Sequence, residues 1–269
     1  MRGKLAVTLL LSAAIAWPAL GAGKRFEGLV EMKSVEKSKT PFGGEQSRET
    51  TQTTYYRQGM IKIVEQPDNR VTIIRADKQI VWSIDLNAKT YTEMTFQQAA
   101  EMQKRLRERS RQIQSEMAAQ LQNLPPEQRQ MMEKMMQSQM GKMTKEAMEG
   151  KFRLSWKETG ETAEILGHLC KKYIGLINDQ PILEAWVTDQ YDVGEELASL
   201  LKAEGLLGGE GESEIQVLHG LPLKTITTVD LGTGFVREES IAVKIQEASI
   251  PASEFELPGG LTREAMDEE

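Results

Sequence analysis

The fold is decided by residues 96–150, which read FQQAAEMQKRLRERSRQIQSEMAAQLQNLPPEQRQMMEKMMQSQMGKMTKEAMEG. In the first half of this stretch, apolar residues recur every three, four or seven positions, which is the period of one face of an α-helix. Charged and polar side chains fill most of the other positions. The apolar positions are Ala99, Met102, Leu106, Ile113, Met117, Leu121 and Leu124. This spacing predicts a long amphipathic helix that begins at Phe96.

The helix is expected to stop before Pro125-Pro126, because proline has no amide hydrogen for a helix interior and disfavours helical geometry at the residue before it. Pro126 suits the first turn of a second helix, and Glu127 is favourable near a helix N-terminus. The second helix carries a methionine stripe formed by Met131, Met132, Met135, Met136, Met140 and Met143. We therefore predict a methionine-rich helical hairpin over residues 96–150. Its methionine face is either a lid over the rest of the fold or a surface for a partner.

Residues 1–22 have the composition of a secretory signal peptide. Arg2 and Lys4 precede the apolar run Leu5–Trp17, and small residues follow that run. The run is shorter than the roughly 20 apolar residues that a membrane span needs, and no later stretch approaches that length. We expect export to the periplasm of a Gram-negative bacterium, removal of the signal peptide, and a soluble mature chain. A retained N-terminal anchor is the alternative.

The composition narrows the function classes. The formal net charge is −7, and the basic cluster at 104–111 is interrupted by Glu108, so a nucleic-acid partner is not expected. Cys170 is the only cysteine, so we expect no internal disulfide and a small buried side chain, with a reactive or intermolecular thiol as the alternative. The chain has no Gly-x-Ser-x-Gly motif and no acidic pair that stands out. We therefore expect neither an enzyme nor a bound cofactor.

Both sides of the hairpin have the patterns of β-strands. Residues 23–95 contain short strands separated by turn-forming residues, which predicts an antiparallel meander. Residues 151–261 return to this pattern, apart from a helix near 191–204 with Asp192 as its N-cap. We expect one α+β domain, mainly antiparallel β, that the hairpin interrupts. Residues 262–269 are expected to form a frayed acidic tail.

Two interruptions are expected within these β regions. Lys37 to Ser47 surrounds the sequence Pro-Phe-Gly-Gly and is expected to be a turn or a mobile loop. Alternation resumes after the hairpin at Leu154 and Trp156, and Gly160 is expected to begin a turn.

Six short motifs resemble, in their order along the chain, an uncharacterised "domain of unknown function" family of exported bacterial proteins. They are WSID at 82–85, KTY at 89–91, LPPEQ at 124–128, GHLCKKY at 167–173, GLPL at 220–223 and FELP at 255–258. The strand with Val81, Trp82 and Asp85 is also similar to the outer-membrane lipoprotein carriers LolA and LolB, and to the envelope-stress regulator RseB. That similarity implies a strongly curved, half-barrel-like sheet, wrapped partly around helices, with a concave apolar cavity for acyl chains. The long methionine-rich hairpin departs from these compact carriers.

The candidate ligand-binding residues are four aromatic residues on separate predicted strands: Trp82, Tyr91, Trp156 and Trp186. If their inward faces coincide, they line a concave apolar site; the alternative is that each is an ordinary core residue. His168 and Cys170 would face the same side of a strand, and methionine thioethers suit Cu(I). A metal site is the weaker hypothesis, because an isolated His-x-Cys lacks further ligands and methionines at helical spacing usually serve packing.

Three functions follow, in order of preference. The first is a non-enzymatic periplasmic binding or chaperone-like protein for an apolar cargo, such as a lipid or a lipoprotein acyl chain. The second is a structural or regulatory envelope protein that engages a partner through the hairpin. The third is a methionine-based copper binder. The sequence leaves open the cargo, the oligomeric state and whether the sheet is closed.

Overall fold

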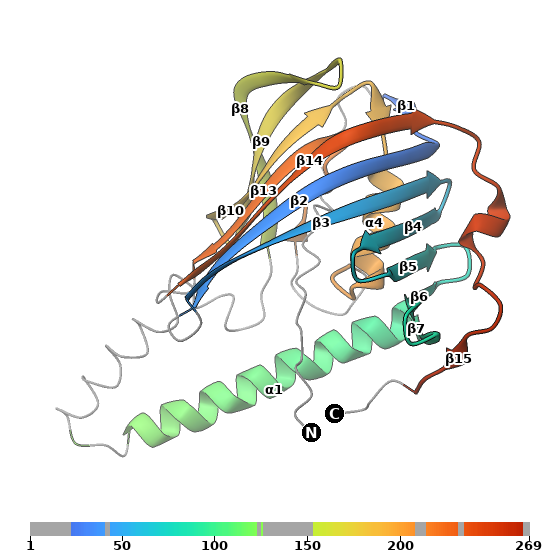
Figure 1. Ribbon diagram of the computed structural model, residues 1–269. Helices are drawn as coiled ribbons and strands as arrows, with labels where there is room; N and C mark the ends of the chain where they lie inside the picture. Colours follow the sequence, from blue (N-terminus) through green and yellow to red (C-terminus); the bar gives the residue numbers. More distant parts are fainter. Residues whose placement is uncertain are drawn as a thin grey trace.

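The computed structural model describes residues 23–40, 44–122, 125, 153–207, 214–230 and 234–265. Within these residues the fold is a single open sheet of 13 strands, a two-stranded sheet and two α-helices (Figure 1). The sequence correctly predicts a mainly antiparallel β protein with added helices. The predicted signal peptide, the second helix of the hairpin and the methionines from Met131 to Met143 lie outside the described residues.

The strands of the large sheet lie side by side in a fixed spatial order. They are β12 (Glu214–Ile215), β8 (Arg153–Ile165), β9 (His168–Ile177), β10 (Gln180–Thr188), β13 (Leu221–Asp230), β14 (Phe235–Glu247), β2 (Gly28–Thr40), β3 (Gly44–Arg57), β4 (Met60–Gln66), β5 (Arg70–Arg75), β6 (Ile80–Asp85), β7 (Thr90–Thr95) and β15 (Thr262–Arg263). Neighbours are antiparallel except at the two edges, where β12 pairs with β8 and β15 pairs with β7 in parallel. The meander from β4 to β7 confirms the pattern in the sequence. The small sheet joins β1 (Lys24–Arg25) to β11 (Tyr191–Asp192).

Two long strands replace an expected loop. β2 runs to Thr40 and β3 begins at Gly44, and the two strands pair along the whole of β2. The loop expected over residues 37–47 is therefore wrong, except that residues 41–43 lie outside the described part of the chain. β3 is rich in threonine, whose branched Cβ favours the pleated backbone of a strand.

Two other expected boundaries are also corrected. β8 continues past Gly160 to Ile165, with a register shift between Glu158 and Thr162 that marks a bulge. Gly160 has φ +81°, a value that glycine adopts without steric cost, so the bulge bends the strand and does not end it. At the C-terminus, residues 262–263 pair with β7 and are not part of a frayed tail.

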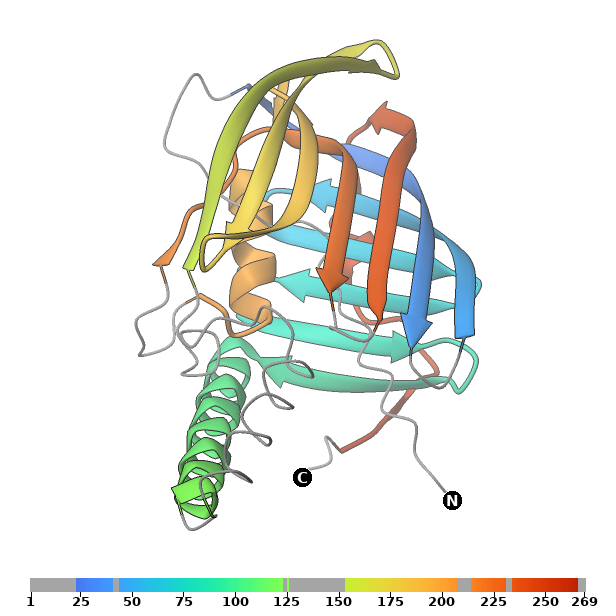
Figure 2. The same cartoon turned by 90° about the vertical axis from the view of Figure 1, so that its left-hand side faces the viewer.

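One face of the large sheet surrounds α4 (Gly194–Ala203), as Figures 1 and 2 show from two sides. The apolar side of this helix faces the sheet, with Val193, Leu197 and Leu201 buried and Leu200 half-buried. The expected N-cap is wrong, because Asp192 belongs to β11 and Val193 takes the N-cap position without a side-chain hydrogen bond. The Asp192 carboxylate instead accepts hydrogen bonds from the backbone amides of Gly194 and Gly220.

The end of α4 explains why a glycine stands there. Gly205 has φ +68°, and a Cβ at this position would lie 2.4 Å from the carbonyl oxygen of Ala99. Only glycine satisfies both the left-handed backbone and the close approach of the two helices. This contact joins α4 to α1 (Phe96–Gln122), which follows β7.

α1 begins where the sequence predicts. The Gln98 amide donates to the Thr95 hydroxyl at 3.1 Å, and the Thr95 amide donates to the Gln98 side chain at 2.8 Å, which forms a capping box. The helix ends at Gln122, shortly before Pro125. None of the helices in the described ranges has both the length and the apolar composition needed to cross a membrane.

Among the stripe residues of α1 whose side chains the structure describes, only the first is buried. Ala99 is buried, whereas Met102, Leu106 and Ile113 are 44%, 53% and 49% exposed. Figure 1 shows why, because the helix extends away from the sheet after its first turns.

The outer face of the sheet, opposite α4, is covered at β4 to β7 by the C-terminal segment. Phe255, in the short 3₁₀ helix η1 (Ala252–Phe255), packs with Ile73 and Trp82, and neither Phe255 nor Ile73 is exposed. Figure 1 shows this segment, in red, outside the sheet. Strands β4 to β6 therefore bury side chains on both faces.

Candidate functional site

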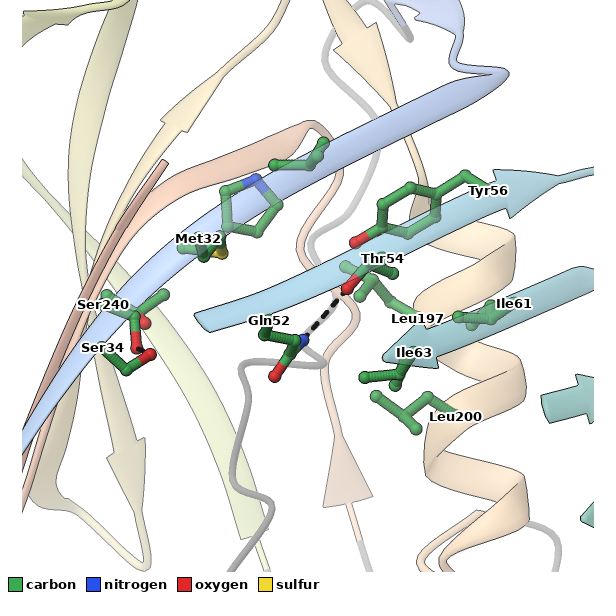
Figure 3. A pocket seen from close by; sticks show the side chains of 13 residues that line it. Met32, Ser34, Gln52, Thr54, Tyr56, Ile61, Ile63, Leu197, Leu200 and Ser240 are labelled. Carbon is green, nitrogen blue, oxygen red and sulfur yellow. Dashed lines mark hydrogen bonds between the residues drawn. The ribbon is translucent and has the colours of Figure 1, made fainter. Parts of the chain in front are cut away.

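A groove lies between α4 and the face of the sheet that surrounds it (Figure 3). It contains a cavity of about 60 Å³. For comparison, one water molecule takes up about 30 Å³ in the liquid. The groove residues are Val30, Met32 and Ser34 of β2; Gln52, Thr54 and Tyr56 of β3; Ile61 and Ile63 of β4; Leu197 and Leu200 of α4; Pro222 and Thr225 of β13; and Ser240 of β14.

Strand alternation and register bring these side chains to one face. On β2 the lining residues are two positions apart, so their side chains share one side of the sheet. Ser34 lies opposite Ser240 of β14, and Thr54 lies opposite Ile63 of β4. We call this side the groove face.

The groove changes from apolar to polar along its length, as Figure 3 shows. The apolar end is formed by Ile61, Ile63, Leu197 and Leu200. Gln52 and Thr54 lie between the ends, and the Gln52 side-chain amide donates to the Thr54 hydroxyl at 3.0 Å. Ser34 and Ser240 form the polar end. Such a gradient matches a molecule with an apolar chain and a polar head.

The polar end is a hydrogen-bonded cluster. The hydroxyl oxygens of Ser34 and Ser240 lie 2.6 Å apart, and both residues are buried. The Ser240 hydroxyl donates to Glu238 Oε1 at 3.4 Å, and Glu238 lies directly opposite Glu36 of β2. Burial raises the pKa of Glu238, and the negative charge of Glu36 raises it further, while the two serine hydroxyls oppose the shift.

Another carboxylate faces the same end of the groove. Glu65 of β4 lies opposite Gln52, so its side chain is also on the groove face. Burial raises the pKa of Glu65; the charge of Arg70 opposes the shift, the charge of Asp68 adds to it and the charge of Arg48 opposes it. Arg48 is itself bonded to the Asp68 carboxylate.

A buried ion pair holds α4 in place as one wall of the groove. Glu196 is 1% exposed and accepts hydrogen bonds from Arg25 of β1 at 2.8 Å and from the Gly59 amide at 3.3 Å. Tyr56 on the opposite wall has a raised pKa, first because of burial and second because of the nearby Glu196 charge. The tyrosine hydroxyl is therefore neutral at physiological pH.

None of the four predicted ligand aromatics lines the groove. Trp82 and Tyr91 are in the outer-face cluster with Phe255, and the Trp82 indole nitrogen donates to Glu93 at 2.8 Å. Trp186 is on the outer face of β10, because its neighbour Ala185 lies opposite Thr225 of the groove. Its ring contacts two cations from adjacent strands, with the ammonium nitrogens of Lys172 and Lys224 at 5.0 and 5.1 Å from the ring centre.

Trp156 is the one predicted aromatic on the groove face. It packs with Leu154 and Leu183 in a cluster on β8 to β10, away from the groove lining. Gly175 on the next strand gives its ring room, since a Cβ there would lie 2.6 Å from the indole. The buried indole nitrogen has no hydrogen-bond partner among the described residues.

Cys170 and His168, the two residues considered for metal binding, each have a structural role. Cys170 is fully buried in the core with Phe26 and Leu197, as the sequence predicts, and burial raises the pKa of its thiol to about 11. His168 shares a hydrogen bond of 2.6 Å with the Gln190 side chain. In the ranges that the structure describes, no three histidine, cysteine, aspartate or glutamate side chains are grouped to hold a metal ion.

Sequence reasoning misses the polar part of the groove. Ser34 and Ser240 are serines on strands with exposed neighbours, and such residues usually face water. The available signal is on β2, where the alternate positions Val30, Met32 and Ser34 run from apolar to polar on one face. The partner strands that complete the site follow from register, which no local pattern gives.

No protein-family model matches the chain, and no curated protein matches its sequence. Several solved structures align with most of it. An uncharacterised conserved protein from Thermus thermophilus has 8% identity and a TM-score of 0.40, with 87% of this chain and 89% of that chain covered.

A LolA superfamily protein from Nitrosomonas europaea has 7% identity and a TM-score of 0.31, with 87% and 92% covered. The crystal structure of MucB has 8% identity and a TM-score of 0.32, with 87% of this chain and 59% of MucB covered. A LolA superfamily protein is thus among the matched structures, as the sequence resemblance suggested. At these values the matches assign no function to this chain.

Proposed function

We propose that this chain is a non-enzymatic binding protein of the bacterial envelope that holds an apolar chain in the groove. The observation that carries the proposal is the groove itself, which has aliphatic side chains at one end and buried hydroxyls at the other. A site of this composition gains binding energy from apolar burial and gains orientation from a few polar groups. The resemblance to lipoprotein carriers in the sequence agrees with it.

The size of the cavity limits what enters without movement. About 60 Å³ is small beside the roughly 300–1,000 Å³ of pockets that hold drug-sized ligands, so without movement the groove accepts only a short part of one unbranched chain. A longer chain can go deeper only if α4 moves away from the sheet. The apolar end then widens first, because Leu200 is only half-buried there.

Chain length is the direct test. We expect straight-chain alcohols to displace the uncharged probe N-phenyl-1-naphthylamine, with affinity rising about fourfold per added methylene group, because each buried methylene contributes about 0.8 kcal/mol. The rise ends where the chain outgrows the groove. A bulky residue inside the groove, Leu200→Trp, should weaken the longest alcohol at least tenfold.

The matched control is Leu169→Trp, which adds the same ring at an exposed leucine of β9. It should leave every alcohol affinity unchanged. Affinities that do not depend on chain length, or that fall equally in the two variants, contradict the proposal. Circular dichroism of both variants keeps a folding defect separate from a blocked groove.

Export of the chain is part of the same proposal. It is supported by the composition of residues 1–22, with a basic start, an apolar run and small residues before Gly23. Fractionation of cells that produce the full chain, with mass spectrometry of the mature N-terminus, tests it. A chain recovered uncleaved from the cytoplasm contradicts this part of the proposal.

A second candidate function is supported by α1. Its exposed stripe of Met102, Leu106 and Ile113 would suit a protein partner in the envelope. Replacing these three residues with glutamine should abolish in-cell photo-crosslinking from position 110 on α1 and leave the alcohol affinities of the groove unchanged. Loss of alcohol binding in this variant would instead make the stripe part of the groove function.

A further inference from the structure

The polar end of the groove presents hydrogen-bond acceptors more than donors. The Ser34 and Ser240 hydroxyls are bonded to each other, and Ser240 also donates to Glu238. When Ser240 donates to Glu238, the Ser34 hydrogen must point to Ser240, so both hydroxyl hydrogens are used within the cluster. The groups left for a ligand are lone pairs on the two hydroxyls and on the carboxylate.

The charges around this end are mainly negative. Glu36, Glu65 and Glu238 all lie on the groove face, and none of them forms an ion pair among the described residues. Two arginines share this face. Arg48 lies opposite Glu36 and is bonded to Asp68, and Arg70 lies between Glu65 and Asp85 in the register of β4, β5 and β6, so two positive charges face five carboxylates.

A negatively charged head would therefore meet repulsion from the carboxylates, and the serine cluster would offer it no donor. Two like charges a few ångströms apart cost several-fold in affinity at a partly screened site, and a buried acceptor that faces another acceptor stays unsatisfied. An amine or hydroxyl head has the opposite balance, because its hydrogens fit the free lone pairs. An ammonium head also gains from the three carboxylates.

From this geometry we infer a ligand class for the groove. We propose that it selects amphipathic molecules with a hydrogen-bond-donating head that carries no negative charge, an ammonium or a hydroxyl group, and discriminates against carboxylate and phosphate heads. This inference rests on the proposed function, since it specifies the head of a chain whose tail occupies the apolar end.

The test compares three twelve-carbon ligands that differ only in the head: dodecylammonium, dodecan-1-ol and dodecanoate. Each is titrated at neutral pH, below the concentration at which it aggregates, by displacement of N-phenyl-1-naphthylamine from the full mature chain. We expect dodecylammonium to bind about tenfold more tightly than dodecanoate, with dodecanol between them. Raising the salt concentration should reduce the ratio of the dodecylammonium affinity to the dodecanoate affinity, because the carboxylates at the polar end are partly exposed and salt screens them.

Substitution of single carboxylates shows which residues cause the head selectivity. Glu238→Gln and Glu36→Gln should each reduce the ammonium-to-carboxylate ratio about threefold. Glu239→Gln is the matched control, because it removes the same charge from the adjacent residue of β14, whose side chain faces outward to Lys224. Its ratio should equal that of the wild type. Dodecylammonium that still binds to the Leu200→Trp variant is bound to the surface outside the groove. This background is subtracted from the dodecylammonium titrations.

The outcomes separate the two proposals. If dodecanoate binds as tightly as dodecylammonium while dodecanol still binds with chain-length dependence, the head selectivity is wrong and the groove function stands. If dodecanol does not bind, the proposed function fails first. If Glu238→Gln and Glu239→Gln have the same ratio of dodecylammonium to dodecanoate affinity, the head selectivity does not come from the polar end of the groove.

Discussion

Strands β4 to β6 bury both of their faces, and the two faces are closed in different ways. On the outer face, Phe255 and the segment around it cover Ile73 and Trp82 almost completely. On the groove face, α4 packs near Ile61 and Ile63, which are also buried, but a cavity remains beside them. Trp82, the one large aromatic residue of β4 to β6, thus lies on the face that the chain closes with its own C-terminal segment. The face that keeps space is lined by aliphatic and hydroxyl side chains.

The largest effect expected from this difference is on stability. Phe255→Ala removes a fully buried ring from the outer face and should lower the free energy of unfolding by about 3–5 kcal/mol in urea denaturation. The dodecanol affinity of the protein that remains folded should not change. Glu254→Ala is the control on the same segment; it breaks only the exposed pair with Lys62 and should cost about 0.5 kcal/mol or less. Normal stability with lost dodecanol binding would remove the distinction between the faces.

A smaller loss of stability is expected when the ion pair that holds α4 against the sheet is removed. Arg25→Ala leaves the buried Glu196 carboxylate with only the Gly59 amide as partner, and should cost about 1–3 kcal/mol. It should also weaken dodecanol binding, because α4 is a wall of the groove. Lys24→Ala is the matched control, since its pair with Glu247 is exposed and should contribute about 0.5 kcal/mol or less. Equal losses from the two substitutions would mean that the buried pair does not hold the helix.

The sequence predicts most of the local structure but little of the difference between the outer face and the groove face. The helical period after Phe96 and the short turns between β4 and β7 are local signals, and the elements follow them. The length of β2 and β3 is not a local signal, because the polar residues after Ser34 read as loop until a partner strand is present along their whole length.

The site is harder to predict for a related reason. A tryptophan is equally compatible with a ligand pocket and with a core, and only the C-terminal segment decides that Trp82 is in a core. The pair Ser34 and Ser240 comes from opposite ends of the chain and meets through the register of β2 and β14. Alternation shows which side chains share a face, but not which strand lies beside them.

The hydroxyl pair at the polar end should contribute less to stability than the ion pair of Arg25 and Glu196. Ser34→Ala and Ser240→Ala should each cost about 1 kcal/mol, because each leaves one buried hydroxyl with fewer partners. The double variant should cost less than the sum of the two, since neither hydroxyl is then left buried without the other. A double-mutant cycle from urea denaturation should therefore give a coupling energy of about 0.5–1 kcal/mol. A coupling near zero would show that the two hydroxyls act independently.

The smallest expected effect is a pair of opposite pH dependences in adjacent residues of β14. The pKa of Glu238 is raised, so its contribution to stability is largest below the ordinary carboxyl pKa and is lost as the pH rises through the raised value. The pKa of Glu239 is lowered, mainly by the hydrogen bond from Lys224, so its contribution is present above the ordinary pKa and is lost as the pH falls through the lowered value.

Glutamine cannot ionise, so each substitution removes one of these dependences. Between about pH 4 and pH 8, Glu238→Gln should become progressively more stable than the wild type, by a few tenths to about 1 kcal/mol, because it removes the repulsion from Glu36 directly opposite. Glu239→Gln should be slightly less stable than the wild type near neutral pH and equal to it in acid. Urea denaturation at several pH values measures both. Slopes of the same sign would mean that β14 does not separate a repulsive groove face from a paired outer face, and the electrostatic basis for excluding anionic heads would be lost with it.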